Sequence, residues 1–160
     1  MVKIGLQIKA NMENTVNLTP MDEDFRWYFK IKCLSCGETP EHFQYITLTE
    51  RSQLKGSRGD ANLTVKCKLC SRENSMDILK ETIKAYQKTD ESFQTVVVFD
   101  CRGIEPTEFS PRAGWKVEGS ESGATFDDVD LKEGEWCDYD EKSDVSVGVY
   151  DIQAQFVKVK

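Results

Sequence analysis

The sequence contains one histidine, His42, among 160 residues, and no long apolar run. A Ser–His–Asp triad would have only one possible base here, and no G-x-S-x-G elbow accompanies it. No segment approaches the roughly 20 apolar residues that span a bilayer. The N-terminus, MVKIGLQIKANM, alternates polar and apolar side chains and so does not resemble a signal peptide. These absences favour a cytoplasmic protein, which can also be nuclear, with reduced cysteines and no membrane contact.

Helical periodicity is also scarce, whereas period-two alternation is strong. Residues 76–86 could form a short helix, although Met76 and Ile78 fit a strand equally well. The predicted strands are 2–10, 25–33, 93–101 and 150–156, with shorter candidates at 43–49, 63–67, 75–80 and 115–118. The sequence therefore predicts an all-β, or mainly β, fold.

Two stretches of the chain resemble each other. Segments 25–33 and 93–101 both begin with Phe and end with Cys, and the loop 56–63 resembles 119–126. We predict a single domain, 1–160, with two pseudo-symmetric β halves, about 1–88 and 89–160. The halves are expected to share one core as an elongated barrel or sandwich. We expect the protein to be a monomer. A zinc site, predicted from the cysteine motifs described next, is expected at hairpin turns of the N-terminal half.

The strongest chemical signal is a pair of C-x-x-C motifs, Cys33-Leu-Ser-Cys36 and Cys67-Lys-Leu-Cys70. Two residues between thiolates allow both sulfurs of a tight turn to reach one tetrahedral ion. Gly37 can take the positive φ that such a turn needs, whereas Ser71 at the matching position predicts a less ideal second turn. A hairpin of 43–49 with 63–67 is expected to fill the gap between the motifs.

Four cysteines predict one Zn²⁺ per chain in a closed site. Such a site leaves no position for water or substrate, which argues against zinc catalysis and for no enzymatic activity. Zinc binding to such sites contributes on the order of 10–16 kcal/mol, so the metal would be a folding element.

The same residues resemble a known family, the eukaryotic CXXC-motif-containing zinc-binding proteins. The matching stretches are DFRWYFKIKCLSCGE, KGSRGDANLTVKCKLCSRENS, FDCRGIEP, ESGATFDDVDL and YDEKSDVSVGVYDIQAQFVK. The resemblance implies zinc on Cys33, Cys36, Cys67 and Cys70 in a β structure of two related halves. It implies no reaction.

Two further positions are candidates for a site. If the halves superpose, Cys101 and Cys137 would approach each other as a second, two-thiol site; the alternative is a buried Cys101 and an independent Cys137. His42 could replace a ligand, but four cysteines suffice, so a surface or supporting position is expected. The loop 56–59 lacks the ending of a phosphate-binding loop and is interpreted as a hairpin loop.

The charge of −7 is uneven. Residues 1–100 are neutral, residues 101–160 carry the acidic excess, and residues 51–72 contain six basic side chains and one acid. An acidic protein is a poor general nucleic-acid binder, so a protein partner is expected. The first functional hypothesis is therefore a zinc-stabilised protein-interaction module. The alternatives are metal handling or a redox-responsive thiol protein, and a cysteine-dependent reductase using Cys137.

Overall fold

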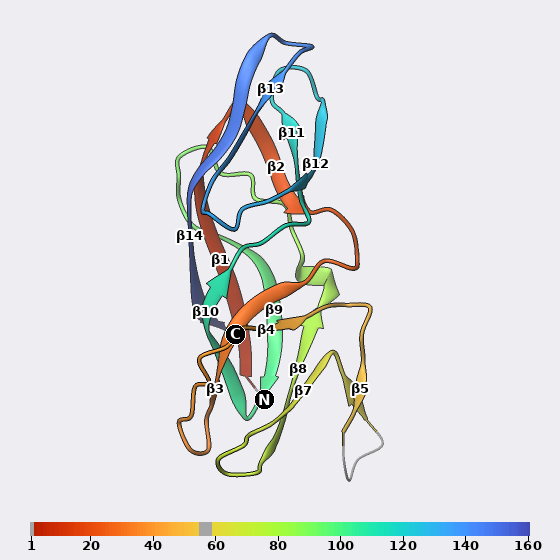
Figure 1. Cartoon of the computed structure of the whole chain (residues 1–160), viewed down its shortest axis with the longest axis vertical. Helices are drawn as coiled ribbons and strands as arrows, with labels where there is room; N and C mark the ends of the chain where they lie inside the picture. Colours follow the sequence, from red (N-terminus) through yellow and green to blue (C-terminus); the bar gives the residue numbers. More distant parts are fainter. Residues whose placement is uncertain (1, 55–58) are drawn as a thin grey trace.

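The computed structural model describes residues 2–54 and 59–160, and its main layer is a six-stranded antiparallel sheet. In spatial order the strands are β13 (Trp136–Asp140), β14 (Val145–Val159), β1 (Val2–Glu13), β9 (Gln94–Arg102), β8 (Glu73–Leu79) and β7 (Leu63–Lys66). The long strands β1 and β14 run along an elongated molecule (Figure 1). The predicted all-β class is confirmed.

Two three-stranded sheets and one two-stranded sheet complete the described part of the fold (Figure 1). One has the order β10 (Ile104–Ser110), β3 (Trp27–Cys33) and β4 (Gln44–Ile46), and the other β12 (Thr125–Val129), β11 (Trp115–Gly119) and β2 (Thr15–Pro20). The short strands β5 (Ser52–Gln53) and β6 (Asp60–Ala61) pair with each other. Among the described residues, no helix has the length and apolar character that a membrane span requires.

An aromatic cluster joins the layers. On β3 the inward positions alternate as predicted, and Trp27 and Phe29 are buried. Both rings meet Phe99 of β9 edge to face, with centroids 6.1 and 5.4 Å apart, and Trp27 also meets Trp115 at 5.8 Å. Such pairs add about 0.5–1.5 kcal/mol each beyond their buried area. The cluster fixes β3, and with it the first C-x-x-C motif, against the large sheet.

Strand β9 differs from its prediction. Alternation predicted one buried face carrying Val97 and Phe99, but Val96 and Val98 are buried as well. The segment after β8 continues along the edge of β9, where the Thr82 hydroxyl accepts a hydrogen bond from the backbone N–H of Val98 at 2.8 Å. Of the two alternatives for residues 76–86, the strand is confirmed for Met76 and Ile78 and the short helix is wrong, because β8 continues to Leu79 and one 3₁₀ turn, Lys80–Thr82, follows.

The predicted hairpin of 43–49 with 63–67 is also wrong. Strand β4 pairs with β3, and Tyr45 lies opposite Tyr28 with ring centroids 5.6 Å apart. Strand β7 pairs with β8 instead. Each C-x-x-C motif therefore lies between a strand and its own partner strand.

The N- and C-terminal parts of the sequence share one sheet, since β1 pairs with both β14 and β9. The boundary near residue 88 and the pseudo-symmetry of the halves stay predictions.

Candidate metal centre

The two C-x-x-C turns have the same backbone geometry. Cys33 ends β3, and its carbonyl accepts a hydrogen bond from the N–H of Gly37 at 2.8 Å. Cys67 follows β7, and its carbonyl accepts the same bond from the N–H of Ser71, also at 2.8 Å. Both turns are thus closed by a bond from the residue after the second cysteine. Each presents its two sulfurs on one side.

The second turn is as well formed as the first. Gly37 has φ +82°, and Ser71 reaches the same left-handed region with φ +63°. A side chain in this region costs roughly 1–2 kcal/mol relative to ordinary backbone, and glycine avoids that cost. The missing glycine therefore does not distort the turn. The prediction of a less ideal second turn is wrong as far as the backbone geometry is concerned. The difference between the turns is one of energy.

The four sulfurs lie close enough to share one ion. Cys33 Sγ is 3.8 Å from Cys70 Sγ, Cys36 Sγ is 3.5 Å from Cys67 Sγ, and all four lie within 4.8 Å of one another. Zn–S bonds of about 2.3 Å in a tetrahedron place the sulfurs about 3.8 Å apart. A disulfide would require about 2.05 Å, and every cysteine of the chain is free. The spacing fits a tetrahedral metal and excludes disulfides.

Backbone N–H groups favour the thiolate form of the first cysteine in each turn. The N–H of Cys36 is the largest influence on Cys33, and it lowers the pKa of that thiol to about 6 against the opposing effect of desolvation. The N–H of Cys70, followed by that of Leu69, lowers the pKa of Cys67. Because metals bind the thiolate, the first cysteine of each turn is organised for coordination. At Cys36 the N–H of Glu38 acts in the same direction, but desolvation and the hydrogen bond with Cys67 outweigh it and raise the pKa of this thiol to about 12.

The two cysteines of each turn differ in exposure. Cys33 and Cys67 are buried, whereas Cys36 and Cys70 are exposed. The turns also touch each other directly, since the Arg72 guanidinium donates a hydrogen bond to Ser35 Oγ at 3.3 Å. One side of the sulfur cluster therefore faces the core and the other faces solvent.

Sequence reasoning missed two residues that support this site. Buried Asn74, on β8, donates a side-chain hydrogen bond to Cys33 Sγ at 3.7 Å. Gly103, between β9 and β10, accepts a hydrogen bond from the N–H of Leu34 at 2.9 Å and leaves no room for a Cβ beside Asn74. The one signal of this arrangement in the sequence is the glycine at position 103. Glycine readily adopts a positive φ, and Gly103 has φ +79°.

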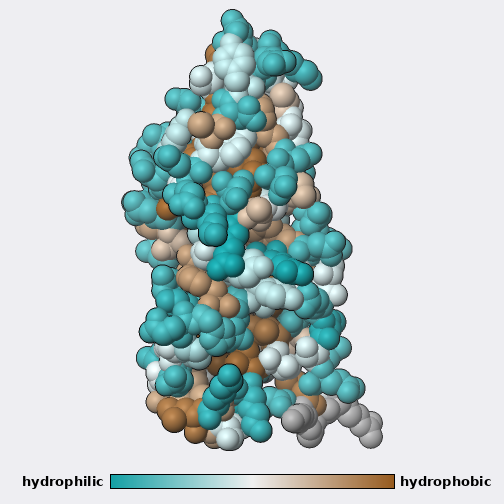
Figure 2. Space-filling view, viewed as in Figure 1, coloured by the Kyte–Doolittle hydropathy of each residue, from teal (hydrophilic) through white to brown (hydrophobic). Residues whose placement is uncertain are grey.

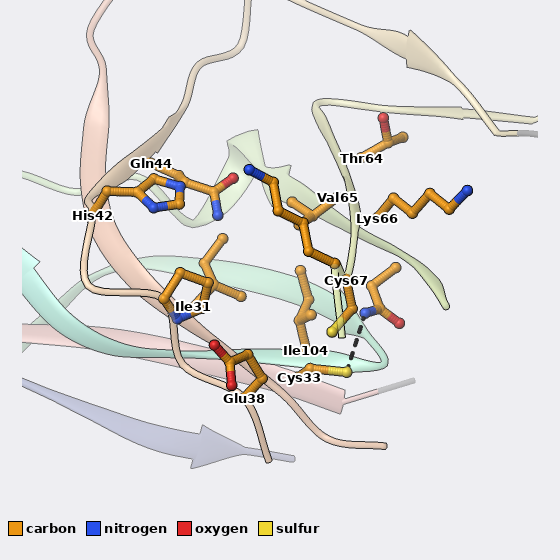
Figure 3. A pocket seen from close by; sticks show the side chains of 13 residues that line it. Ile31, Cys33, Glu38, His42, Gln44, Thr64, Val65, Lys66, Cys67 and Ile104 are labelled. Carbon is orange, nitrogen blue, oxygen red and sulfur yellow. Dashed lines mark hydrogen bonds between the residues drawn. The ribbon is translucent and has the colours of Figure 1, made fainter. Parts of the chain in front are cut away.

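His42 lies outside the sulfur cluster, as expected. It lines a cavity of about 430 Å³ that begins at Cys33 and Cys67 and extends between β4 and β7 (Figure 3). The predicted loop 56–59 falls mostly on residues outside the described part of the chain.

The hypothesis of a second site at Cys101 and Cys137 is wrong. Cys101 lies opposite Val2 at one end of β1, whereas Cys137 lies opposite Gly148, which pairs with Glu13 at the other end. A strand rises about 3.3 Å per residue, so the length of β1 separates the two thiols by roughly 35 Å. Burial, the largest cause, raises the pKa of Cys101 to about 12. Cys101 is a core residue.

The chain is similar to known proteins over nearly its whole length. The profile of the family "CXXC motif containing zinc binding protein, eukaryotic" matches residues 5–157. The proteins of that name from Bos taurus and Homo sapiens are 56% and 55% identical over 159 residues, with 99% of each chain covered. UPF0587 protein CG4646 of Drosophila melanogaster is 46% identical, covering 100% of this chain and 99% of the relative. The solved structure "Crystal Structure of C1orf123" superposes with a TM-score of 0.93 at 54% identity, over 98% of this chain and 99% of that one.

Proposed function

Because the chain belongs to the family of eukaryotic CXXC-motif-containing zinc-binding proteins, we propose that one zinc ion is held by Cys33, Cys36, Cys67 and Cys70 and that the zinc-bound chain is a protein-interaction module. The observation that carries the proposal is the spacing of the four sulfurs, which matches a tetrahedral thiolate site. Four protein ligands complete the coordination of zinc. The metal then joins the end of β3 to the β7–β8 turn and does not bind substrate.

The surface beside the cluster supports the interaction role. Each turn exposes a large apolar side chain: Leu34 is 48% exposed and Leu69 is 67% exposed. Figure 2 shows apolar surface at the lower end of the molecule, where both turns lie in Figure 1. Exposed apolar groups gathered at one end are typical of contact surfaces between proteins. Zinc would hold the two leucines at a fixed spacing.

Metal analysis of protein purified without added zinc tests the first part. We expect one zinc per chain, and we expect Cys67→Ser with Cys70→Ser to lose the metal and much of the stability. Zinc-free protein with an unchanged Tm would contradict the structural site. The interaction role is tested with the Leu34→Ser, Leu69→Ser variant, which should keep zinc and lose partners in affinity purification. An unchanged set of partners would contradict a role for these leucines.

Metal transfer is a second candidate function, favoured by the exposure of Cys36 and Cys70. A site with two reachable sulfurs allows a chelator or acceptor thiol to approach without global unfolding. The rate of zinc transfer to a competing chelator separates the two functions. A metal that leaves only as fast as the protein unfolds supports the structural role.

The reductase hypothesis gains no support. His42 lies at the zinc end of the molecule, and β13, which carries Cys137, lies at the opposite end (Figure 1). The chain's one imidazole therefore cannot activate that thiol.

A further inference from the structure

The four sulfurs of the metal centre make two close contacts that cross between the turns. Cys36 and Cys70, the second cysteine of each turn, are exposed, whereas Cys33 and Cys67 are buried. Cys36 Sγ lies 3.5 Å from Cys67 Sγ, and Cys70 Sγ lies 3.8 Å from Cys33 Sγ. Each exposed cysteine is therefore in contact with the buried cysteine of the opposite turn.

The buried cysteines lie on the inner side of the cluster. Cys33 and Cys67 line the cavity together with the apolar side chains of Ile31 and Ile104 (Figure 3). An oxidant that arrives from solvent consequently meets the exposed cysteines first. The oxygen added to an exposed sulfur then points to solvent, and a buried thiolate can attack that sulfur from the opposite side.

We propose that the metal centre is also a peroxide-responsive switch, in which Cys36 forms a disulfide with Cys67 and Cys70 forms one with Cys33 as zinc is released. This inference concerns the regulation of the zinc site proposed above and rests on that site. Both disulfides join one turn to the other. The oxidised chain therefore keeps the end of β3 attached to the β7–β8 turn after the metal has left.

The reaction balances with hydrogen peroxide as the oxidant. Zinc holds the sulfurs as thiolates, and the Cys36 thiolate attacks the peroxide, so that the O–O bond breaks and a sulfenic acid and one hydroxide form. The Cys67 thiolate attacks the sulfenic sulfur, the S–O bond breaks, and a second hydroxide leaves. Two thiolates thus give up two electrons, which reduce one peroxide to two hydroxide ions. Zinc keeps two of its four ligands, and a second peroxide removes these in the same way.

A hydrogen bond sets the order of the two disulfides. The Asn74 amide donates to Cys33 Sγ at 3.7 Å, which makes this sulfur a weaker nucleophile. The contact between Cys36 and Cys67 is also the shorter of the two. We therefore expect the Cys36–Cys67 disulfide to form first.

Peptide mapping tests the pairing. The zinc-loaded Cys137→Ser variant, which lacks the exposed thiol outside the cluster, is treated with hydrogen peroxide, and the remaining free thiols are blocked before digestion with trypsin. Cleavage after lysine and arginine separates the cysteines into peptides 33–51, 67–68 and 69–72. We expect 33–51 to be linked first to 67–68, and then to 69–72 as well. Tandem mass spectrometry should assign the first link to Cys36.

Disulfides within each turn would give a different set of peptides. Peptide 33–51 would then carry an internal disulfide and no link, and 67–68 would be joined to 69–72. That result would overturn the proposal. Sulfinic acids at Cys36 and Cys70 without any disulfide would overturn it too.

Zinc release and thermal stability provide a second test. Peroxide should release zinc to a chromophoric chelator at least roughly tenfold faster than the chelator removes it alone. The oxidised protein should have a higher Tm than protein stripped of zinc under reducing conditions, because the disulfides replace the metal in joining the turns. Dithiothreitol with added zinc should restore the starting state. Equal Tm values of the oxidised and stripped proteins would contradict the switch.

Zinc content before oxidation tests the metal site separately. A chain purified with one zinc that then forms disulfides only within its turns would refute the switch and leave the structural site intact. A chain purified without zinc would refute the metal site itself, and the switch with it.

Discussion

The side-chain amide of Asn74 donates a hydrogen bond to the sulfur of Cys33 across 3.7 Å, from a position on β8 that is almost fully buried. An N–H bond to a thiolate offsets part of its negative charge without adding a ligand. Four thiolates around Zn²⁺ carry a net charge of −2, so such a donor lowers the cost of burying Cys33. Asn74 is in turn held by the absence of a side chain at Gly103.

Gly103→Ala should therefore weaken the metal site as well as the fold. The added methyl group meets the Asn74 carboxamide, and the alanine must also adopt φ +79°. We expect a loss of about 2–4 kcal/mol in unfolding free energy, from backbone strain plus displacement of the amide. Faster zinc loss to a chelator should accompany it.

Gly123→Ala is the matched control for this prediction. Gly123 has φ +73°, but a Cβ at this position would meet nothing within 4 Å, so only the backbone cost applies there. Its loss should be about 1–2 kcal/mol, with no change in zinc release. Equal effects of the two substitutions on both measurements would show that the Asn74 contact contributes nothing.

Exchanging the residues after the two turns should shift stability in opposite directions. Ser71→Gly removes the strain of φ +63° and should raise the unfolding free energy of the zinc-bound protein by about 1 kcal/mol. Gly37→Ser should lower it by a similar amount, because a Cβ there meets no neighbour and only the backbone cost remains. Denaturant unfolding at fixed zinc concentration measures both. A loss of stability in Ser71→Gly would contradict this account of the turn.

Thiol labelling of the native, zinc-bound protein should modify one cysteine quickly. Cys137 is exposed, whereas burial raises the pKa of Cys101 to about 12. We expect Cys101 to react only when the protein unfolds, at a rate at least roughly a hundredfold below that of Cys137. Mass spectrometry of the labelled peptides measures both rates. Comparable rates at the two positions would contradict the placement of Cys101 in the core.

Asp140→Asn should destabilise the end opposite the zinc site in a pH-dependent way. The Ser122 hydroxyl donates to this carboxylate, and that bond is the main cause of its lowered pKa; the N–H of Lys142 also donates to it, at 3.1 Å. A carboxyl group with a lowered pKa in the folded state stabilises the protein above its ordinary pKa and loses that contribution as pH falls through the folded value. The Tm difference from wild type should be largest near pH 7 and shrink toward pH 3. A difference independent of pH would argue against the charged hydrogen bonds.

Local patterns predicted the parts of the fold that depend on neighbouring residues. Alternation located β3 because Trp27, Phe29 and Ile31 bury one face, and C-x-x-C spacing located all four sulfurs of the cluster. Both signals lie within a few residues of sequence, where the strand period and the reach of two thiolates are fixed by covalent geometry.

Strand pairing could not be predicted in the same way. The sequence suggested that 43–49 pairs with 63–67 because they flank one loop, but the contact between Tyr28 and Tyr45 accompanies the pairing of β4 with β3. Asn74 and Gly103 were missed for a related reason. Their roles depend on β8 and the β9–β10 turn meeting the end of β3, which no local pattern encodes.

Strand β1 lies between β9 and β14 in the large sheet, and its register with β14 extends from Lys3 to Glu13. During synthesis, both edges of β1 can be paired only after the last strand, β14, has been made. The cysteines at 33–70 are synthesised much earlier. If zinc binds as proposed, it can therefore join the two C-x-x-C turns on the ribosome while β1 is still unpaired. A chain that stops short of residue 145 would keep an unpaired edge on β1, open to association with other chains and to recognition by chaperones.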